Sequence, residues 1–277
     1  MNRVVLADNL TALAEIADES VDLIYIDPPF NTGKTQRRTQ LRTVRDEAGD
    51  RTGFAGRRYR SEQLGVREFA DRFDDYLAFL APRIEHARRV LKPEGSFYFH
   101  VDYREVHYCK VLIDGIFGRE QFVNEIIWAY DYGARTQKRW PAKHDNILFY
   151  AKDAERYHFD LAEVDRIPYM APSLVGEEKA RAGKLPTDTW WHMLVSPTGK
   201  EKLGYPTQKP LGVLNRIVRA SCPPGGVVLD FFAGSGTTGA AALAAGRRFV
   251  LVDHNPEAIA VIKRRFAGQD GIEYVGC

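Results

Sequence analysis

Short β-rich runs alternate with segments of helical period along most of the chain, and this alternation constrains the fold more than any other feature. The predicted strands are 3–7, 21–26, 95–101, 125–130, 146–151, 226–232 and 248–253. The predicted helices are 75–91, 104–117, 211–221, 238–245 and 256–266. Strands that are apolar on both faces and separated by helices indicate a mainly parallel sheet covered on both sides. Strands 125–130 and 146–151 have no long helix between them, so we expect an antiparallel pair at one edge.

The composition narrows the class of protein. Of the 277 residues, 44% are hydrophobic, which suffices for the core of one α/β domain and disfavours bulk disorder. The three cysteines, Cys109, Cys222 and Cys277, lack C-x-x-C spacing, so they offer no zinc cluster and are typical of a reducing compartment. No run approaches the roughly 18 apolar residues of a membrane span, and the N-terminal apolar run is too short for a signal peptide. We expect a cytoplasmic protein without a metal or a membrane partner.

Two segments depart from the alternation. Residues 34–63 are polar and show little periodicity, and residues 34–60 carry nine Lys or Arg against three acids, a local net charge of +6. Residues 154–205 contain scattered Pro and Gly and the pair Trp190-Trp191. Long irregular segments are usually binding loops or lids, or else disordered. The net charge of the whole chain is only +2, so the position of the charges decides whether nucleic acid is a partner.

A glycine-rich turn follows the strand 226–232. Gly234, Gly236 and Gly239 stand in G-x-G-x-x-G spacing before an Ala-rich helix, which allows close approach of a ligand to the backbone and to the helix N-terminus. Asp253 ends the next strand, 19 residues after Gly234, where a carboxylate can accept both hydroxyl hydrogens of a ribose. The same pattern fits a dinucleotide site or a plain strand–helix turn.

The order of the strands along the chain and the position of Asp230 bear on which ligand this turn binds. Only 24 residues follow Asp253 and the other strands lie upstream, so we expect a permuted sheet rather than two consecutive mononucleotide halves. Asp230, just before the glycines, suits a ligand with a cationic amino group.

The tetrapeptide Asp27-Pro28-Pro29-Phe30 ends the strand 21–26. Two prolines fix φ and remove two N–H donors, so the turn presents a carboxylate, unpaired carbonyl oxygens and an aromatic face. A planar heterocycle that carries an NH2 group matches these acceptors, and adenine and cytosine are the obvious candidates. The alternative is a structural turn that caps a helix.

Together these motifs resemble those of the beta class of DNA amino-methyltransferases. "DPPFNTG" (27–33) resembles their catalytic motif, and "LDFFAGSGTTGAAA" (229–242) resembles their S-adenosylmethionine loop. "GYPTQKPLGVLNRIV" (204–218) is similar to the segment before that loop. "LKPEGSFYFHVD" (91–102) and residues 124–152 are also similar, so the resemblance covers most of the chain except 34–63 and much of 154–190.

The resemblance implies one permuted Rossmann-like methyltransferase domain over residues 1–277, with a mostly parallel seven-stranded sheet and one reversed strand. It also implies a basic loop insertion at 34–63 and a target-recognition segment at 154–200. Asp253 stands where the family more often has Glu, and Asp8 has the alternative of a helix N-terminal acid. The implied cofactor-binding residues are Asp8, Thr207, Gln208, Lys209, Pro210, Asp230, Phe231, Phe232, Ala233, Gly234, Ser235, Gly236, Thr237, Thr238, Asp253, His254 and Asn255.

The implied activity is direct transfer of a methyl group to the exocyclic amine of a flipped-out base in double-stranded DNA. Asp27 and the Pro28 carbonyl would each accept one N–H of the amine, and Phe30 would stack on the base, so Asp27, Pro28, Pro29 and Phe30 form the implied catalytic set. Trp190 and Trp191 are candidates for a wedge, or else belong to the core. The expected DNA contacts are Lys34, Arg37, Arg38, Arg57, Arg58, Lys138 and Arg139, with Lys143 nearby.

Several alternatives stay open. The expected target is the N6 amine of adenine, because Asp at position 27 is typical of the adenine enzymes and Ser of the cytosine enzymes. The N4 amine of cytosine is the alternative, since cytosine offers the same edge. An RNA or protein amide methyltransferase more often begins the tetrapeptide with Asn, and a nicotinamide-binding protein leaves the tetrapeptide unexplained. The resemblance also allows a homodimer and a cognate restriction endonuclease as partners.

Overall fold

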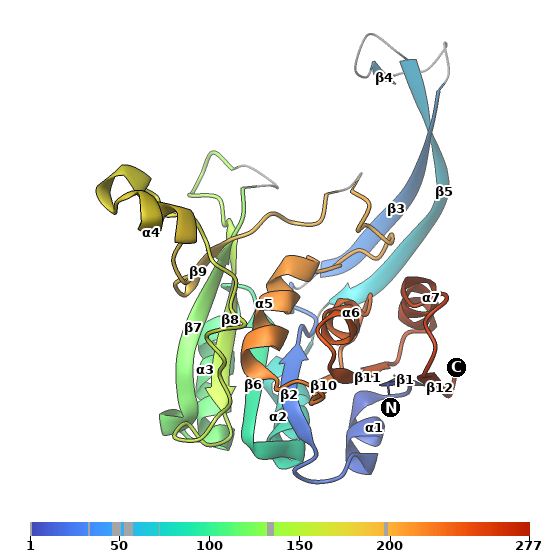
Figure 1. Ribbon diagram of the computed structural model, residues 1–277. Coiled ribbons are helices and arrows are strands. Elements are labelled where there is room, and N and C mark those ends of the chain that lie inside the picture. The colour runs from blue at the N-terminus through green and yellow to red at the C-terminus, as the bar shows by residue number, and fades with distance from the viewer. Residues whose placement is uncertain are drawn as a thin grey trace. The chain divides into compact units, whose positions relative to one another are not determined.

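The computed structural model describes residues 2–32, 34–45, 51–52, 58–71, 73–131, 136–196 and 199–277 (Figure 1). The chain divides into two compact units, Met1–Pro28 with Leu77–Cys277, and Pro29–Tyr76. The larger unit contains the main sheet and its helices, and the smaller unit contains a separate three-stranded sheet.

The main sheet of the larger unit has nine strands among the described residues. They are β1 (Asn2–Leu6), β2 (Val21–Ile26), β6 (Leu91–Val101), β7 (Phe122–Ala129), β8 (His144–Ala151), β9 (Thr189–Trp191), β10 (Val227–Asp230), β11 (Arg248–Asp253) and β12 (Ile272–Val275). Their order in space is β12-β1-β11-β10-β2-β6-β8-β7-β9. Strand β8 is antiparallel to both of its neighbours, β6 and β7. All other neighbouring pairs of this sheet are parallel.

The structure confirms the predicted mixed α/β fold with a mainly parallel sheet and one reversed strand. All the predicted strands form, and the predicted antiparallel pair is β7 with β8. The sheet has nine strands rather than the implied seven because the short strands β12 and β9 extend its two edges. Strand β9 covers only Thr189–Trp191, which is too short to give a periodic signal.

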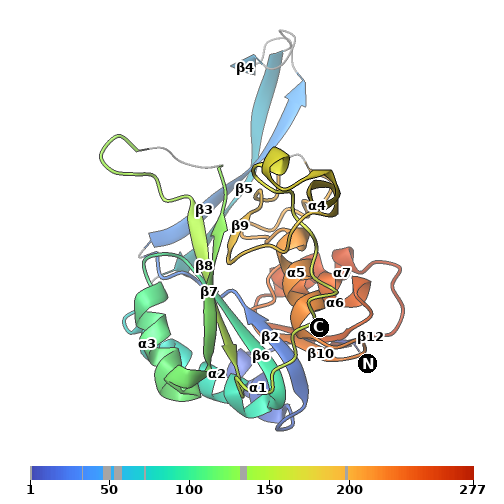
Figure 2. The same ribbon diagram turned by 60° about the vertical axis from the view of Figure 1, so that its left-hand side comes forward.

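Helices cover both faces of this sheet (Figure 2). The alternation of side chains along β6 shows this directly, since the ring of Phe97 stacks on Phe117 of α3 while Tyr98 hydrogen bonds to Ser221 of α5 on the other face. Helices α1 and α2 lie on the α3 side, and α6 and α7 lie on the α5 side. The helices are α1 (Asn9–Glu15), α2 (Tyr76–Val90), α3 (Val106–Phe117), α5 (Leu211–Ser221), α6 (Thr237–Ala244) and α7 (Pro256–Arg265), and η2 (Arg119–Gln121) follows α3.

Strand β2 lies near the middle of the sheet, and all six of its residues are buried. Burial of each large apolar side chain contributes roughly 1.5–3 kcal/mol. The single acid in the strand, Asp22, accepts hydrogen bonds from Lys92 Nζ and from the Val227 N–H, each at 2.8 Å. The pairing of its carboxylate explains how an acid is tolerated inside a buried strand.

The smaller unit contains paired strands where the sequence predicts an irregular basic loop. Strand β3 (Lys34–Arg45) runs antiparallel to β5 (Arg58–Asp71), and the two-residue strand β4 (Arg51–Thr52) also pairs with β5. The expectation of an irregular segment at 34–63 is therefore wrong for the described backbone. The sequence of these strands is mostly polar, so it lacks the sustained apolar alternation that would have revealed them.

Residues 154–205 also contain short elements, η3 (Pro172–Leu174) and α4 (Glu177–Ala182) in addition to β9. The N–H groups of Ile167 and Lys184 each donate to the carbonyl of the other, at 2.8 and 2.9 Å. This bridge closes the neck of a loop that contains η3 and α4. Arg216 of α5 anchors the neck with two hydrogen bonds to Asp165, each of 2.7 Å.

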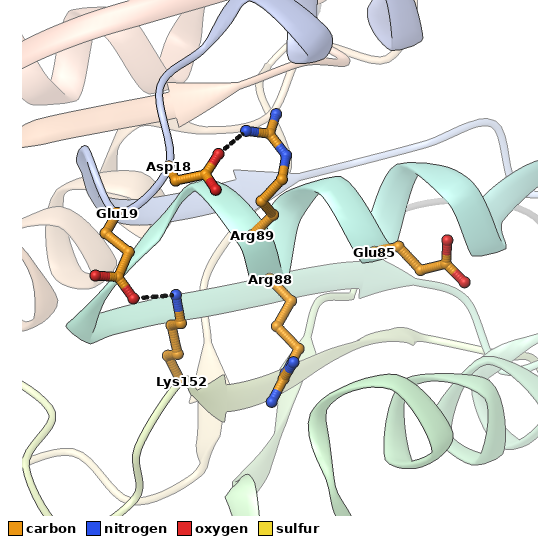
Figure 3. A pocket seen from close by; sticks show the side chains of 6 residues that line it. All are labelled: Asp18, Glu19, Glu85, Arg88, Arg89 and Lys152. Carbon is orange, nitrogen blue, oxygen red and sulfur yellow. Dashed lines mark hydrogen bonds and ion pairs between the residues drawn. The ribbon is translucent and has the colours of Figure 1, made fainter.

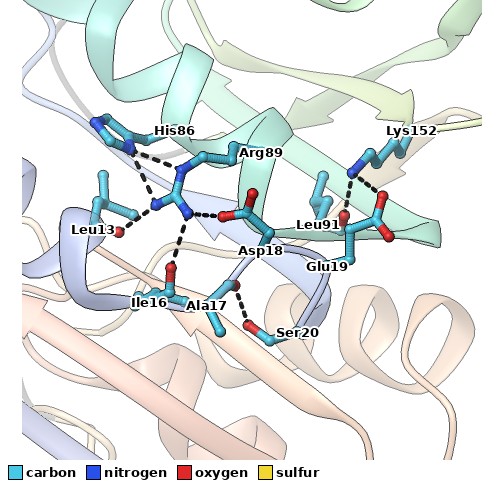
Figure 4. A network of polar contacts seen from close by, with 10 residues as sticks. All are labelled: Leu13, Ile16, Ala17, Asp18, Glu19, Ser20, His86, Arg89, Leu91 and Lys152. Atoms are coloured by element: carbon cyan, nitrogen blue, oxygen red, sulfur yellow. Dashed lines mark hydrogen bonds and ion pairs between the residues drawn. The ribbon is translucent and has the colours of Figure 1, made fainter.

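A charged pocket lies at the amino ends of the parallel strands (Figure 3). Its lining residues are Asp18, Glu19, Glu85, Arg88, Arg89 and Lys152. Arg89 donates to the Leu13 and Ile16 carbonyls at 2.7 and 3.0 Å and pairs with Asp18, so it satisfies carbonyls at the end of α1 (Figure 4). Lys152 likewise pairs with Glu19. These contacts join α1 to α2 and to the sheet.

Candidate active site

Three acids gather at the carboxyl ends of neighbouring strands. Asp27 follows β2, Asp230 ends β10 and Asp253 ends β11. These strands are adjacent and parallel in the order β11-β10-β2. The next strand of this sheet after β10 is β11 on one side, whereas the next after β2 is β6 on the other side. Such a switch point is where open parallel sheets bind ligands.

The glycine-rich turn connects β10 to α6. Gly234 and Gly236 have φ angles of +50° and +72°, a region that favours glycine. A Cβ on Gly234 would lie 3.1 Å from the ring of Tyr205, and one on Gly239 would lie 2.7 Å from Leu251. The first two glycines therefore serve the turn, and the third lets α6 pack closely on the sheet.

Asp230 is almost fully buried behind this turn. Its carboxylate accepts hydrogen bonds from Thr238 Oγ1 at 2.6 Å and from the Phe232 N–H at 3.0 Å. The pKa of Asp230 is raised to about 7, chiefly by burial. The two hydrogen bonds oppose this rise, and the nearby charges of Asp27 and Asp253 add to it. A cationic ligand would stabilise the ionised form of such a buried acid.

Asp253 holds the turn from the neighbouring strand. Its two carboxylate oxygens accept the N–H groups of Gly234 at 2.8 Å and Asn255 at 2.9 Å. Asn255 caps α7 by accepting the Glu257 N–H at 2.9 Å, and His254 extends into solvent. Asp253 is thus a structural support of the glycine turn as well as a predicted ligand for ribose.

Arg265 of α7 supports the glycine turn, and the sequence reasoning missed this role. It donates to the Ser235 carbonyl at 2.7 Å and to Thr237 Oγ1 at 3.2 Å, so it fixes the turn from behind. Its position near the end of an amphipathic helix resembles that of an ordinary surface arginine, and the sequence gives no signal for the contact.

The ammonium group of Lys209 lies on the carboxylate of Asp27. Lys209 Nζ is 2.5 Å from Asp27 Oδ2, and the two side chains are 13% and 14% exposed. The other oxygen, Asp27 Oδ1, is buried and has no hydrogen-bond partner among the described residues. The backbone of Lys209 faces the glycine turn, since its carbonyl accepts a hydrogen bond from Thr237 Oγ1 at 3.2 Å.

The rest of the 207–210 segment has structural roles. Gln208 is buried, accepts the Leu203 N–H at 2.9 Å and donates to the Glu201 carbonyl at 2.6 Å. Thr207 is exposed, and Pro210 is the residue that precedes α5.

A chain of polar groups that the sequence reasoning also missed begins at Tyr25, near the end of β2. The Tyr25 hydroxyl is 2.6 Å from His100 Nδ1, His100 Nε2 is 3.3 Å from Asp145 Oδ2, and Tyr130 donates to Asp145 Oδ1 at 3.1 Å. Burial raises the pKa of Tyr25, and the charges of Asp27, Asp230 and Asp145 raise it further. The three acids lie at or near the ends of strands that are far apart in the sequence, and all three raise the pKa of the same buried tyrosine.

Asp8 caps a helix in the structure. Its Oδ1 accepts the Leu10 and Thr11 N–H groups at 2.9 and 3.4 Å at the start of α1, and its side chain is 57% exposed. Asn9 ties the same corner to the loop after β10, because its Nδ2 donates to the Phe231 carbonyl at 3.3 Å. These contacts agree with the alternative that the sequence left open for Asp8, an acid at the N-terminus of a helix.

The second half of the tetrapeptide belongs to the smaller unit. The Pro29 carbonyl accepts a hydrogen bond from the Tyr76 hydroxyl at 2.6 Å, so the expectation of unpaired carbonyl oxygens is wrong for Pro29. Phe30 is half-buried.

The structure describes the predicted DNA contacts unevenly. Lys138 and Arg139 are exposed between β7 and β8, with the Arg139 guanidinium 5.9 Å from the ring of Tyr103. The side chains of Lys34, Arg37, Arg38 and Arg58 and the whole of Arg57 lie outside the described residues.

The predicted tryptophan pair divides. Trp190 is buried beneath the Arg216 guanidinium at 4.7 Å, and its Nε1 donates to the Thr187 carbonyl. Trp191 is 77% exposed, and Trp140, which the sequence reasoning did not single out, is 92% exposed. Of these three rings, only Trp191 and Trp140 are open to contact with a base.

With this geometry established, the chain can be compared with known proteins. A family model described as DNA methylase matches residues 21–264. The chain is 32% identical to the DNA adenine methyltransferase YhdJ of Escherichia coli (strain K12), over 93% of this chain and 80% of that protein. It is 28% identical to the type II methyltransferase M.HpaI of Haemophilus parainfluenzae, over 98% and 77% of the two chains.

Solved structures show the same fold. The complex of M1.HpyAVI with SAM matches with a TM-score of 0.60 and 21% identity, over 96% of this chain and 100% of that chain. The cytosine-N4-specific PvuII DNA methyltransferase matches with a TM-score of 0.64 and 17% identity, over 98% and 88% of the two chains.

The fold and the clustered acids define an α/β methyltransferase, and the chain belongs to the N6/N4 DNA methylase family. It is therefore a DNA methyltransferase, as the motifs predict, and its cofactor is the methyl donor of that family, S-adenosylmethionine. No helix in the described part of the chain is long and apolar enough to cross a membrane. No three His, Cys, Asp or Glu side chains within the described ranges are grouped to hold a metal ion.

Proposed function

We propose that the protein transfers the methyl group of S-adenosylmethionine to the N6 amine of an adenine that is flipped out of duplex DNA. The observation that carries the proposal is the state of Asp27: one oxygen is held by Lys209, and the other is buried without a partner among the described residues. An acceptor in this state suits an N–H donor from a ligand.

The residues around the glycine turn fit the cofactor. Asp230, whose pKa burial raises to about 7, gains most from a cation and would bind the ammonium group of the methionine end. Asp253 would accept the ribose hydroxyls, since each of its oxygens retains acceptor capacity beyond one backbone N–H. Gly234 and Gly236 leave room for close approach of the ligand. Asp8 would reach the adenine edge from the end of β1.

The chemistry requires orientation more than acid–base strength. Bound S-adenosylmethionine supplies the methyl group, and its sulfur keeps the electrons of the broken C–S bond. Asp27 Oδ1 and the Pro28 carbonyl would each accept one N–H of the target amine, which would aim the nitrogen lone pair at the methyl group. Asp27 Oδ1 would then accept the proton that the methylated nitrogen sheds and pass it to solvent. Phe30 would stack on the flipped base.

Adenine is favoured over cytosine by residue 27. Asp at this position is typical of the adenine enzymes that the tetrapeptide resembles, and YhdJ carries the name of a DNA adenine methyltransferase. Methylation of cytosine at N4 is the second candidate, because the cytosine-N4-specific PvuII enzyme shares the fold and the same chemistry serves both bases.

DNA binding is assigned to the basic strand β3, to Arg58 at the start of β5, and to Lys138 and Arg139. Their net positive charge would neutralise phosphates and help to offset the cost of base flipping, which is about a few kcal/mol. The loop above the Ile167–Lys184 bridge would contribute to target recognition. A second copy of the chain and a cognate restriction endonuclease remain proposed partners.

Mass spectrometry of nucleosides from DNA incubated with purified protein and S-adenosylmethionine tests the proposal. N6-methyladenine is expected, and N4-methylcytosine would keep the mechanism but move the base assignment to the second candidate. Asp27→Ala should abolish transfer while S-adenosylhomocysteine still raises the melting temperature, and Asp270→Ala, an exposed acid, should change neither. Stabilisation by NAD instead of S-adenosylhomocysteine would indicate a nicotinamide-binding protein and overturn the proposal.

A further inference from the structure

The contact between Lys209 and Asp27 joins the two halves of the site. Lys209 precedes α5 and Asp27 follows β2, and the two residues are separated by 182 positions in the sequence. We propose that Lys209 is a positioning residue for methyl transfer: its ammonium group holds Asp27 Oδ2, so that Asp27 Oδ1 is presented in one orientation to the target amine. The inference rests on the proposed function, because it assigns a role within the same site.

The backbone of Lys209 is fixed on the cofactor side. Thr237 Oγ1, in the glycine turn, donates to the Lys209 carbonyl at 3.2 Å. The preceding residue, Gln208, is buried and held by two hydrogen bonds to the 201–203 loop. The Leu211 N–H donates to Glu201 Oε1 at 2.6 Å and fixes the start of α5. A lysine on so constrained a backbone can transmit the position of the cofactor turn to the carboxylate.

A second carboxylate acts on the same ammonium group. Burial acts to raise the pKa of Asp145, but the hydrogen bond and charge of His100 and then the charge of Lys209 lower the pKa below its ordinary value overall. Asp145 is itself fixed by His100 and Tyr130. Lys209 is therefore attracted by one acid that is anchored in the core and by one that faces the ligand, and this arrangement restricts where the ammonium group can lie.

The ion pair has a chemical consequence for Asp27. A carboxylate with one oxygen held by an ammonium group rotates less than a free carboxylate. A carboxylate fixed in this way suits a group that orients the target amine before transfer. Asp27 Oδ1, buried and without a partner among the described residues, is the atom left for that contact.

A role as a direct cofactor ligand is the rival explanation for Lys209. The two roles differ in what a substitution should change. Loss of a positioning residue lowers the rate of the chemical step, whereas loss of a ligand lowers the affinity for the cofactor. Single-turnover rates with duplex DNA and dissociation constants for S-adenosylhomocysteine separate them.

The test compares Lys209→Met, Lys209→Arg and wild type in the full chain. Lys209→Met should lower the single-turnover rate by about 100-fold, because misplacement of a reacting group by about 1 Å costs that much. The Kd for S-adenosylhomocysteine should change by less than about threefold, and Lys209→Arg, which keeps a cationic donor, should recover part of the rate. Lys152→Met is the matched control, since Lys152 pairs with Glu19 at the amino ends of the strands.

Each remaining outcome is decisive. An unchanged rate in Lys209→Met, or a loss of cofactor affinity equal to the loss of rate, would overturn the inference and leave the proposed function intact. Wild-type protein that binds S-adenosylhomocysteine but methylates no base in any DNA would overturn the proposed function, and the inference would fall with it.

Discussion

Asp253 Oδ2 accepts the backbone N–H of Gly234 at 2.8 Å, so the acid at the end of β11 supports the glycine turn at the end of β10. The two residues are 19 positions apart and lie on neighbouring parallel strands. One carboxylate thus serves the turn and, in the proposed function, the ribose of the cofactor.

Replacement of Asp253 by Asn should weaken cofactor binding. The variant loses charge-assisted acceptors for the ribose hydroxyls, each worth about 1.5–3 kcal/mol, and leaves one of two backbone N–H groups without its partner. The Kd for S-adenosylhomocysteine, measured by calorimetry, should rise by about 10- to 100-fold. Asp270→Asn, an exposed acid in the same region of sequence, is the control. Equal affinity of the Asp253 variant and wild type would remove the ribose role.

Affinity for S-adenosylmethionine should depend on pH through Asp230. The pKa of this buried acid is raised to about 7, so below pH 7 a cationic ligand must displace a proton to bind. Affinity should rise by up to about tenfold per pH unit below 7 and level off above it. Titrations between pH 5.5 and about 8.5 check this, and Asp230→Asn should bind weakly with a flat profile. A steep profile in that variant would contradict the assignment.

Asp230 also makes the folding stability of the ligand-free protein depend on pH, but this stability falls with rising pH, whereas the cofactor affinity rises. The folded-state pKa of Asp230 lies above its ordinary value of 3.8, so the folded protein holds the proton more tightly than the unfolded chain. The resulting stabilisation is complete below about pH 4 and is lost as the pH rises through about 7. Asp230→Asn should remove this part of the pH dependence in denaturant unfolding.

Removal of charges from β3 should weaken DNA binding without affecting the cofactor. The double change Arg37→Gln and Arg38→Gln should reduce the slope of log affinity against log salt by about 0.9 for each phosphate that the variant no longer neutralises. Fluorescence anisotropy at several salt concentrations measures this slope. Lys263→Gln, on the exposed side of α7, removes one cation elsewhere and should leave the slope unchanged. An unaltered slope in the double variant would separate this strand from DNA.

The loop above the Ile167–Lys184 bridge offers a test of target recognition. Because the bridge already joins the two ends, replacement of residues 168–183 by a short Asn-Gly turn should preserve the neck and its Asp165–Arg216 ion pair. The loop exposes Met170 and Leu174 almost completely, so little core is removed. Sequence preference or DNA affinity should change while cofactor affinity stays. Unchanged methylation patterns, read by single-molecule sequencing, would exclude the loop from recognition.

Arg89 should contribute to stability alone. Arg89→Ala removes donors from two carbonyls at the end of α1 and should lower the free energy of unfolding by about 1–3 kcal/mol. Arg88→Ala, an exposed neighbour that lines the same pocket (Figure 3), should change it by less than about 0.5 kcal/mol. Urea unfolding provides the comparison. An altered cofactor affinity in the Arg89 variant would show that the amino ends of the strands influence the site.

Local patterns in the sequence were enough to predict the family, the two motifs and most of the main sheet with its helices, although they missed β9, β12 and α1. Periodic burial and turn chemistry are local signals, so β2 and the glycine turn are evident without a structure. Strands β3 and β5 were missed for the same reason, since their sequences are mostly polar and give no sustained apolar period.

Which side chains meet in the site became evident only from the folded chain. Lys209 contacts Asp27 across 182 positions, Arg265 supports the glycine turn from α7, and Asp145 approaches the site on the reversed strand β8. A mainly parallel sheet brings strand ends together whatever their distance in the sequence, and no local pattern records which side chains it will pair.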